Sequence, residues 1–212
     1  MARAERKTGR TQEERSTAMR QRLLDATVEC LVEYGYAGTT VTKIAERAGV
    51  TRGAQVHHYR TKADLVAAAI THLAERLAEQ ALVDLQRLGH SEDLIGDALD
   101  LIWEVHQGPV FAASVEFWVA ARTDPSLRDH VAALEHTTVM TVAETGKDVL
   151  GEAATRPEYM HVLYTAMDVV RGILISSWAN PDPAQRTARW KRAKERLRVM
   201  IAATLDEAGL PH

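Results

Sequence analysis

The chain is poor in the residues that stabilise secreted or strand-rich proteins. Its single cysteine, Cys30, excludes an internal disulfide framework and favours a reducing compartment. Only six prolines and two phenylalanines occur among the 212 residues, while alanine, leucine, valine, arginine and glutamate dominate. This mixture favours helix. No strand-like alternation and no internal repeat is visible, so we expect an all-α fold.

Long apolar runs are also missing. The most apolar segment, Val162 to Ala179, is interrupted by Asp168 and Arg171, and a membrane helix rarely carries two charges at its centre. No apolar stretch follows the basic start, so a signal peptide is not expected. These absences predict a cytoplasmic protein with no membrane partner.

Signatures of catalysis are absent as well. The sequence has no Gly-rich phosphate loop, no nucleophile elbow and no His-Glu-x-x-His spacing. Nothing therefore suggests an enzyme, and we predict neither a cofactor nor a metal site.

Charge is divided unevenly along the chain. Residues 1–60 hold eleven Lys and Arg against seven Asp and Glu, a net +4, whereas residues 61–212 hold fifteen against twenty-two, a net −7. A basic front on an acidic body indicates a polyanionic partner for the front alone. Residues 1–16 are polar and carry five of the basic residues, which predicts a mobile basic arm.

Helical periodicity begins after this arm. From Thr17 the apolar residues Leu24, Val28, Leu31 and Val32 recur at helical spacing, and Gly35 is expected to stop that helix. Beyond residue 90, helix-like stretches at 91–106, 109–123, 126–150, 156–179 and 184–208 are separated by glycine and proline.

Residues 40–60 have the pattern of two short helices joined by a tight turn. The first follows Thr39-Thr40 and directs Ile44, Ala45 and Ala48 inward. Gly49 supplies the left-handed residue that ends it. Thr51 is a suitable N-cap for a second helix from Arg52 to Tyr59, and Thr61 with Asp64 predicts a capping box for a long helix reaching about Leu88.

Such a pair predicts a helix-turn-helix, whose second helix enters the major groove of DNA while the first crosses the backbone. Arg52 could then form a bidentate contact with guanine. The adjacent His57 and His58 are a poor metal pair, since neighbouring helical residues point about 100° apart, and contact with the groove or its phosphates is the better interpretation.

The order of these features resembles the tetracycline-repressor (TetR) family. The resemblance is carried by the gap-free run from Thr39 to Ala54, by His57-His58-Tyr59 and by the segment from Thr61 to Leu65, and it covers about residues 17–70. It implies a three-helix DNA-binding domain followed by a helical domain for ligand binding and dimerisation. It also implies DNA contacts from Thr40, Thr42, Lys43, Thr51, Arg52, Gly53, Ala54, Val56, His57, His58 and Lys62.

Two positions depart from the family pattern. Gln55 and Val56 stand where the family usually has leucine and tyrosine. The tyrosine would supply a phosphate or base contact, and a buried glutamine needs a hydrogen-bond partner. The way in which the second helix reads DNA is therefore expected to differ in detail.

The body carries aromatic, methionine and polar residues that suit either a core or a ligand pocket. Any one of them taken alone is better explained as core. Arg171 could pair with Asp168 on the same helix face or bind an acidic group of a ligand. The candidate pocket residues are Trp103, His106, Phe111, Phe117, Trp118, His136, Met140, Tyr164, Met167, Asp168 and Arg171.

Together these features predict a basic arm at 1–16, a DNA-binding domain at 17–65 and a ligand-binding and dimerisation domain at 66–212. The helices at 156–179 and 184–208 are expected to form a four-helix interface between two chains. The predicted function is a dimeric repressor that binds a palindromic operator in double-stranded DNA and is released by a small hydrophobic effector. A DNA-binding architectural protein, and a helical enzyme or carrier with an incidental helix-turn-helix, are the alternatives.

Overall fold

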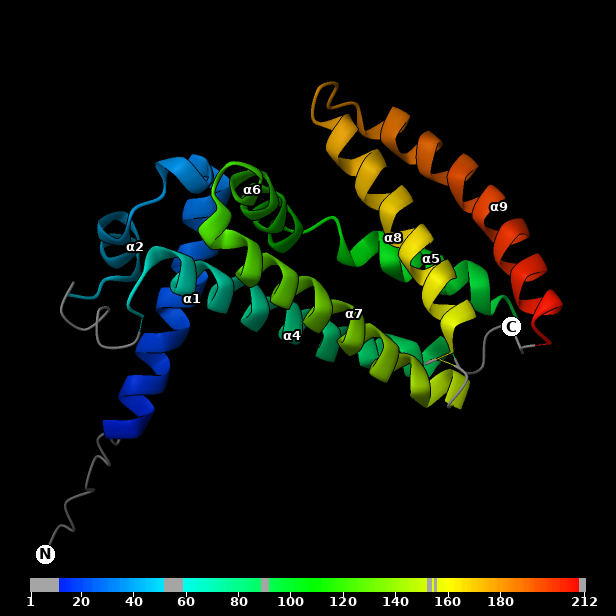
Figure 1. Ribbon diagram of the computed structural model, residues 1–212, viewed down its shortest axis with the longest axis horizontal. Coiled ribbons are helices and arrows are strands. Elements are labelled where there is room, and N and C mark those ends of the chain that lie inside the picture. The colour runs from blue at the N-terminus through cyan, green and yellow to red at the C-terminus, as the bar shows by residue number, and fades with distance from the viewer. Residues whose placement is uncertain (1–11, 52–58, 89–91, 152–153, 155, 210–212) are drawn as a thin grey trace, which may run out of the picture. The chain divides into compact units, whose positions relative to one another are not determined.

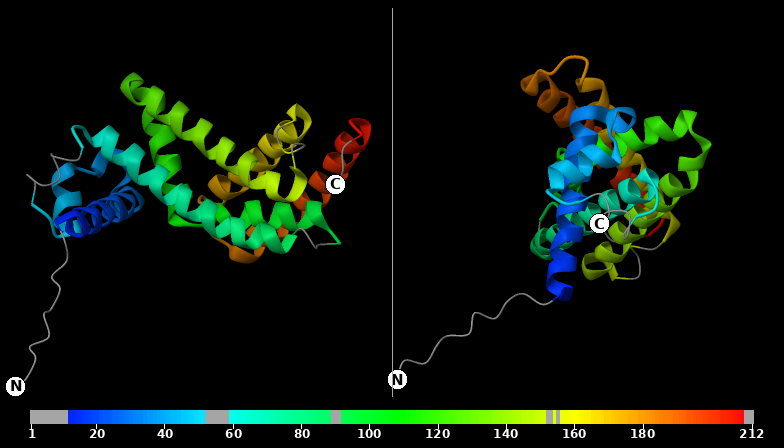
Figure 2. Two further views of the ribbon diagram at one scale, coloured as in Figure 1. Left: turned by 90° about the horizontal axis from the view of Figure 1, so that it is seen from below. Right: turned by 90° about the vertical axis from the view of Figure 1, so that its left-hand side faces the viewer.

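The computed structural model describes residues 12–51, 59–88, 92–151, 154 and 156–209, and these contain helices and turns but no strand (Figures 1 and 2). The prediction of an all-α fold is confirmed for this part of the chain. The elements are α1 (Gln12–Gly38), α2 (Val41–Ala48), α4 (Lys62–Leu88), α5 (Leu94–Val105), α6 (Pro109–Thr123), the 3-10 helix η1 (Pro125–Leu127), α7 (Arg128–Leu150), α8 (Pro157–Ser177) and α9 (Pro183–Glu207).

Proline is rare but placed where helices begin. Four of the six prolines are the first residue of α6, η1, α8 or α9, because the fixed φ of proline suits that position and its missing N–H is not needed there. The predicted stretch 109–123 coincides with α6, and the predicted stretch 126–150 is divided into η1 and α7. None of the described helices has the length and apolar character that a membrane crossing requires.

Two compact units make up the chain. Unit 1 consists of the described residues up to His72 together with 113–131, and unit 2 of those from 73 to 112 and from 132 onward. Unit 1 therefore includes the end of α6, η1 and the start of α7, all of which lie beyond the DNA-binding domain that the sequence predicts at 17–65.

The core of unit 1 is built by α1, α2 and the start of α4. Leu24, Val28 and Leu31 are buried as the periodicity predicts, but Val32 is 49% exposed and lies outside the core. The expected stop at Gly35 is a break inside α1, where the residue has φ 65° and ψ 175°. Glycine adopts this conformation readily because it has no Cβ.

Unit 2 contains the antiparallel pair α8 and α9, with α5 packed against both (Figure 1). Trp103 of α5 stacks on Trp190 of α9 with ring centroids 4.9 Å apart. Asp100 accepts hydrogen bonds from Trp190 Nε1 at 3.1 Å and from Lys194 Nζ at 2.5 Å. This arrangement supports the interpretation of the basic run 186–198 as the polar side of a packed helix.

Candidate nucleic-acid interface

The start of α2 is fixed by its N-cap. Thr40 accepts a hydrogen bond from the backbone N–H of Lys43 at 3.2 Å, and its carbonyl accepts the N–H of Ile44 at 3.0 Å. Ile44, Ala45 and Ala48 are buried as expected. Thr40, Thr42 and Lys43, which are predicted to contact DNA, are exposed at this end. Exposed backbone N–H groups at a helix N-terminus favour an anion such as phosphate.

The turn after α2 has the geometry that the sequence predicts. Gly49 has φ 63° and ψ 39°, in the left-handed region. Its N–H donates to Glu46 O at 3.1 Å, and the N–H of Val50 donates to Ala45 O at 3.0 Å. These bonds satisfy the last carbonyls of α2 in the Schellman pattern, and the chain leaves the helix in the direction of Thr51.

Lys43 contacts the end of α1 as well as facing solvent. Its ammonium donates to the carbonyl of Gly38 at 2.8 Å and lies 4.1 Å from the ring centroid of Tyr34. A cation is favoured at a helix C-terminus and over an aromatic face. The side chain is exposed, so a phosphate contact would use a cation whose position is already set by α1.

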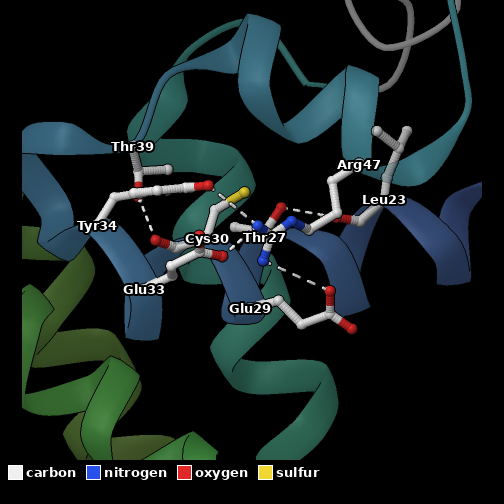
Figure 3. A network of polar contacts seen from close by, with 8 residues as sticks. All are labelled: Leu23, Thr27, Glu29, Cys30, Glu33, Tyr34, Thr39 and Arg47. Atoms are coloured by element: carbon white, nitrogen blue, oxygen red, sulfur yellow. Dashed lines mark hydrogen bonds and ion pairs between the residues drawn. The ribbon is translucent and has the colours of Figure 1, made fainter.

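Arg47 ties α2 to α1 through an exposed network of polar contacts (Figure 3). Its guanidinium binds the Glu33 carboxylate, lies 3.7 Å from that of Glu29 and donates to the Tyr34 hydroxyl at 3.2 Å. Hydrogen bonds from Tyr34 and then from Arg47 lower the pKa of Glu33. The network orients α2 and also neutralises acidic side chains of α1 that would repel DNA.

Lys62 is predicted to bind a phosphate, and its ammonium lies against the end of α1. It donates to Tyr36 O at 2.9 Å and to Thr39 O at 3.3 Å, and it lies 3.8 Å from the ring centroid of Tyr36. Burial lowers the pKa of Lys62. These contacts support the turn before α2, and the phosphate contact stays a prediction.

The segment that would form the second helix lies outside the described residues. This applies to the predicted contacts at Arg52, Gly53, Ala54, Val56, His57 and His58, and to the departure at Gln55. On either side of this segment Thr51 is exposed and Tyr59 is buried. Arg20 of α1 donates from Nε to the Tyr59 hydroxyl at 3.1 Å.

Several residues of this region were not singled out by sequence reasoning. Arg20, Tyr34, Arg47 and Glu116 all act through contacts with residues more than ten positions away. The one local signal was the pair of tyrosines, Tyr34 and Tyr36, beside the break in α1. Such partners follow only from the folded arrangement.

The residues predicted to line a pocket are divided between the two units. Phe117 and Trp118 belong to unit 1, where the ring of Phe117 packs against Tyr36 with centroids 5.7 Å apart. In unit 2, Trp103, Phe111 and Met167 are buried. His136, Met140, Tyr164 and Asp168 are exposed in the single chain.

His106 and Arg171 remain the polar candidates of unit 2. His106 Nδ1 lies 2.8 Å from Ile102 O, and its ring meets Phe111 edge-on at 5.4 Å. Burial lowers the pKa of His106 to about 4, so the ring is neutral at pH 7, with Nδ1–H as the donor and Nε2 as an acceptor. Arg171 pairs with Glu135 of α7 at 3.2 Å.

Comparison with known proteins identifies this architecture. The family described as bacterial regulatory proteins, tetR family, matches residues 23–69. The helix-turn-helix transcriptional regulator CymR of Pseudomonas putida is 30% identical over 200 residues, which cover 94% of this chain and 93% of that protein. The chain belongs to the tetR family.

Other members of the tetR family are similar over most of their length. A helix-turn-helix transcriptional repressor of Mycobacterium tuberculosis is 29% identical, covering 83% of this chain and 90% of that protein. The structure of a TetR-family member from Streptomyces coelicolor has a TM-score of 0.61 at 25% identity, covering 84% of this chain and 97% of that one. A multidrug-binding protein, EbrR, in complex with ethidium has a TM-score of 0.58 at 26% identity, covering 84% and 97%.

Membership in the tetR family settles the class of function. The relatives are named as regulators and repressors of transcription, and this chain is a transcriptional regulator with a helix-turn-helix rather than an enzyme. Of the three alternatives that the sequence left open, the helical enzyme or carrier is thereby removed.

Proposed function

We propose that the chain is a repressor that binds a palindromic operator as a homodimer and is released by a small hydrophobic effector. The observation that carries the proposal is the capped start of α2, which exposes Thr40, Thr42 and Lys43 together on a unit whose sequence matches the tetR family. Repression, rather than activation, is supported by the relative that is named a repressor.

Dimerisation is supported by apolar side chains left exposed on the last two helices. Ile175 of α8 is 39% exposed, Trp178 directly after α8 51%, and Val199 of α9 71%. Exposed apolar side chains of this size favour a protein contact. A twofold pairing of α8 and α9 would cover them as a four-helix interface. Two symmetric reading units then require two symmetric half-sites, which is the reason for a palindrome.

An effector is supported by the aromatic and neutral polar groups of unit 2. His106, Phe111 and Trp178 lie in sequence, as Phe111 is 5.4 Å from His106 and 6.5 Å from Trp178 by ring centroids. EbrR, the structural relative, binds the aromatic compound ethidium. The effector would favour one conformation of unit 2 and change the spacing of the two heads through α4, which runs through both units.

Selection of duplexes from a random pool by the purified chain tests DNA binding. Lys43→Ala should weaken binding to every duplex and lower the slope of log K against log salt by about 1, as one lost phosphate contact does. Lys191→Ala, which removes an exposed lysine of α9, is the charge-matched control and should leave the slope unchanged. Equal slopes for wild type and Lys43→Ala would contradict the assigned contact.

A screen of small aromatic compounds tests release. Compounds that bind the free chain should weaken its affinity for the selected duplex, because linkage requires a ligand of one state to oppose a ligand of the other. Tight-binding compounds that never change this affinity would contradict the effector mechanism. Enrichment of many unrelated duplexes, instead of one site, would favour the architectural alternative.

A further inference from the structure

Tyr36 occupies an unusual position at the break in α1. In a continuous helix its N–H would bond to the carbonyl four residues earlier, but the break at Gly35 turns the chain away. The N–H of Tyr36 donates instead to Oε2 of Glu116, on α6, at 3.2 Å. Both residues belong to unit 1. An acidic side chain eighty positions away thus replaces a helical hydrogen bond.

Glu116 fits closely against the break. A Cβ at Gly35 would lie 2.8 Å from Glu116 Oε2, so the carboxylate occupies space that only glycine leaves open. The next residue of α6, Phe117, is fully buried and packs against the Tyr36 ring. Lys62 holds the carbonyl and the ring of the same tyrosine. Tyr36 is therefore gripped by α6 at its N–H and by α4 at its carbonyl.

The segment held in this way leads directly into α2. Thr39 is buried, and its hydroxyl lies 2.7 Å from Gly35 O and 2.9 Å from Cys30 O. Thr40, the N-cap of α2, follows at once. A displacement of Tyr36 would be passed over four residues to the end of α2 that is proposed to meet the DNA backbone. Functional geometry of this kind tolerates shifts of only about 0.5 Å.

We propose that Glu116 is a positioning residue for DNA reading, whose carboxylate fixes the turn between α1 and α2 from outside the helix-turn-helix segment. Glu116 does not touch DNA itself. Its position on α6, which begins in unit 2 and ends in unit 1, gives the reading unit a contact with a helix that the sequence assigns wholly to the body. The inference rests on the sequence-specific DNA binding proposed above.

Glu116→Ala and Glu116→Gln test the proposal in the full chain. Both variants remove one negative charge, but only glutamine keeps an oxygen that can accept the Tyr36 N–H. Hydrogen exchange of the Tyr36 amide in the DNA-free protein should accelerate in Glu116→Ala and stay near the wild-type rate in Glu116→Gln. The same rate in all three proteins would overturn the assigned hydrogen bond.

DNA binding provides the second readout. Affinity for the duplex that the wild-type chain selects should fall about tenfold in Glu116→Ala, the effect of one hydrogen bond to a charged group. It should fall less than about threefold in Glu116→Gln by the same conversion. Affinity for a scrambled duplex should hardly change in either variant, because non-specific binding depends on phosphate charges.

Three outcomes would contradict the proposal. Equal losses in the two variants would show a charge effect, equal losses on both duplexes would show general damage to the fold, and unchanged specific affinity would show that the turn needs no positioning. If Glu116→Ala does not fold, Glu116→Met keeps the aliphatic stem without the acceptor and takes its place. Failure of the wild-type chain to select any duplex would contradict the proposed function, while the amide exchange would still decide whether Glu116 holds the turn.

Discussion

Thr27 and Thr39 are two buried threonines of unit 1 with different structural roles. The Thr27 hydroxyl donates to Leu23 O within one helical turn, at 2.6 Å (Figure 3). The Thr39 hydroxyl joins the turn after Gly35 to the helix before it. Thr39→Val should lower the free energy of unfolding by about 1 kcal/mol, and Thr27→Val by less than about half of that, since the helical turn keeps its backbone bonds. Urea unfolding of both variants measures the difference, and equal losses would contradict the role given to Thr39.

The pH dependence of stability should report His106. Burial lowers the pKa of His106 to about 4 in the folded chain, from a model value of 6.5. The unfolded state therefore binds the proton first, and the stability contributed by the neutral ring is present above pH 6.5 and lost as the pH falls toward 4. Over that range the wild-type chain should lose about 3 kcal/mol more than His106→Gln.

Denaturant unfolding at several pH values checks this expectation. The comparison with His106→Gln removes the contribution of the other titrating groups. Parallel losses of stability in the two proteins would mean that His106 is not buried as a neutral ring.

Lys43 and Lys62 show what sequence reasoning reaches at this scale. Their place at the starts of α2 and α4 was predicted correctly from caps that need only neighbouring residues. Their bonds to the carbonyls of Gly38, Tyr36 and Thr39 were not predicted. Those carbonyls are brought to the two lysines by the break in α1, which a list of residues does not place in space.

At the scale of elements, helix ends were predicted better than helix partners. Thr61 and Asp64 form the expected capping box, with Thr61 Oγ1 accepting the Asp64 N–H at 3.0 Å and Asp64 Oδ2 accepting the Thr61 N–H at 3.1 Å. Both bonds span three residues and so follow from the sequence. The packing of α6 on α1 spans eighty residues, which is why the predicted boundary at 65 separates residues that unit 1 holds together.

Gly49 and Gly35 allow the cost of a backbone conformation to be separated from the cost of a clash. Both have φ near +65°, but a Cβ at Gly49 meets nothing within 4 Å, whereas one at Gly35 meets Glu116 at 2.8 Å. Gly49→Ala should cost about 1–2 kcal/mol for the left-handed conformation alone, and Gly35→Ala more. Thermal and urea unfolding test this order. A smaller loss in Gly35→Ala would contradict the close fit of Glu116 at the break.

At the scale of the whole molecule, dimerisation is the property that the single chain leaves to its surface. Val199 of α9 is 71% exposed and Val119 of α6 is 56% exposed. If α8 and α9 form the interface, Val199→Asp buries an unpaired charge there and should shift the protein toward monomer, while Val119→Asp should not. Sedimentation equilibrium gives the mass of each variant. A monomeric wild-type chain, or equal behaviour of the two variants, would contradict the interface.

The central claim is that two copies of the chain read a twofold-symmetric site. The direct measurement combines selection of duplexes from a random pool with the stoichiometry of the complex on the selected duplex. The account predicts an inverted repeat whose half-sites are separated by about one helical turn or a multiple of it, bound by two chains or a small multiple of two. A selected sequence without twofold symmetry, or a complex with a single chain, would contradict it.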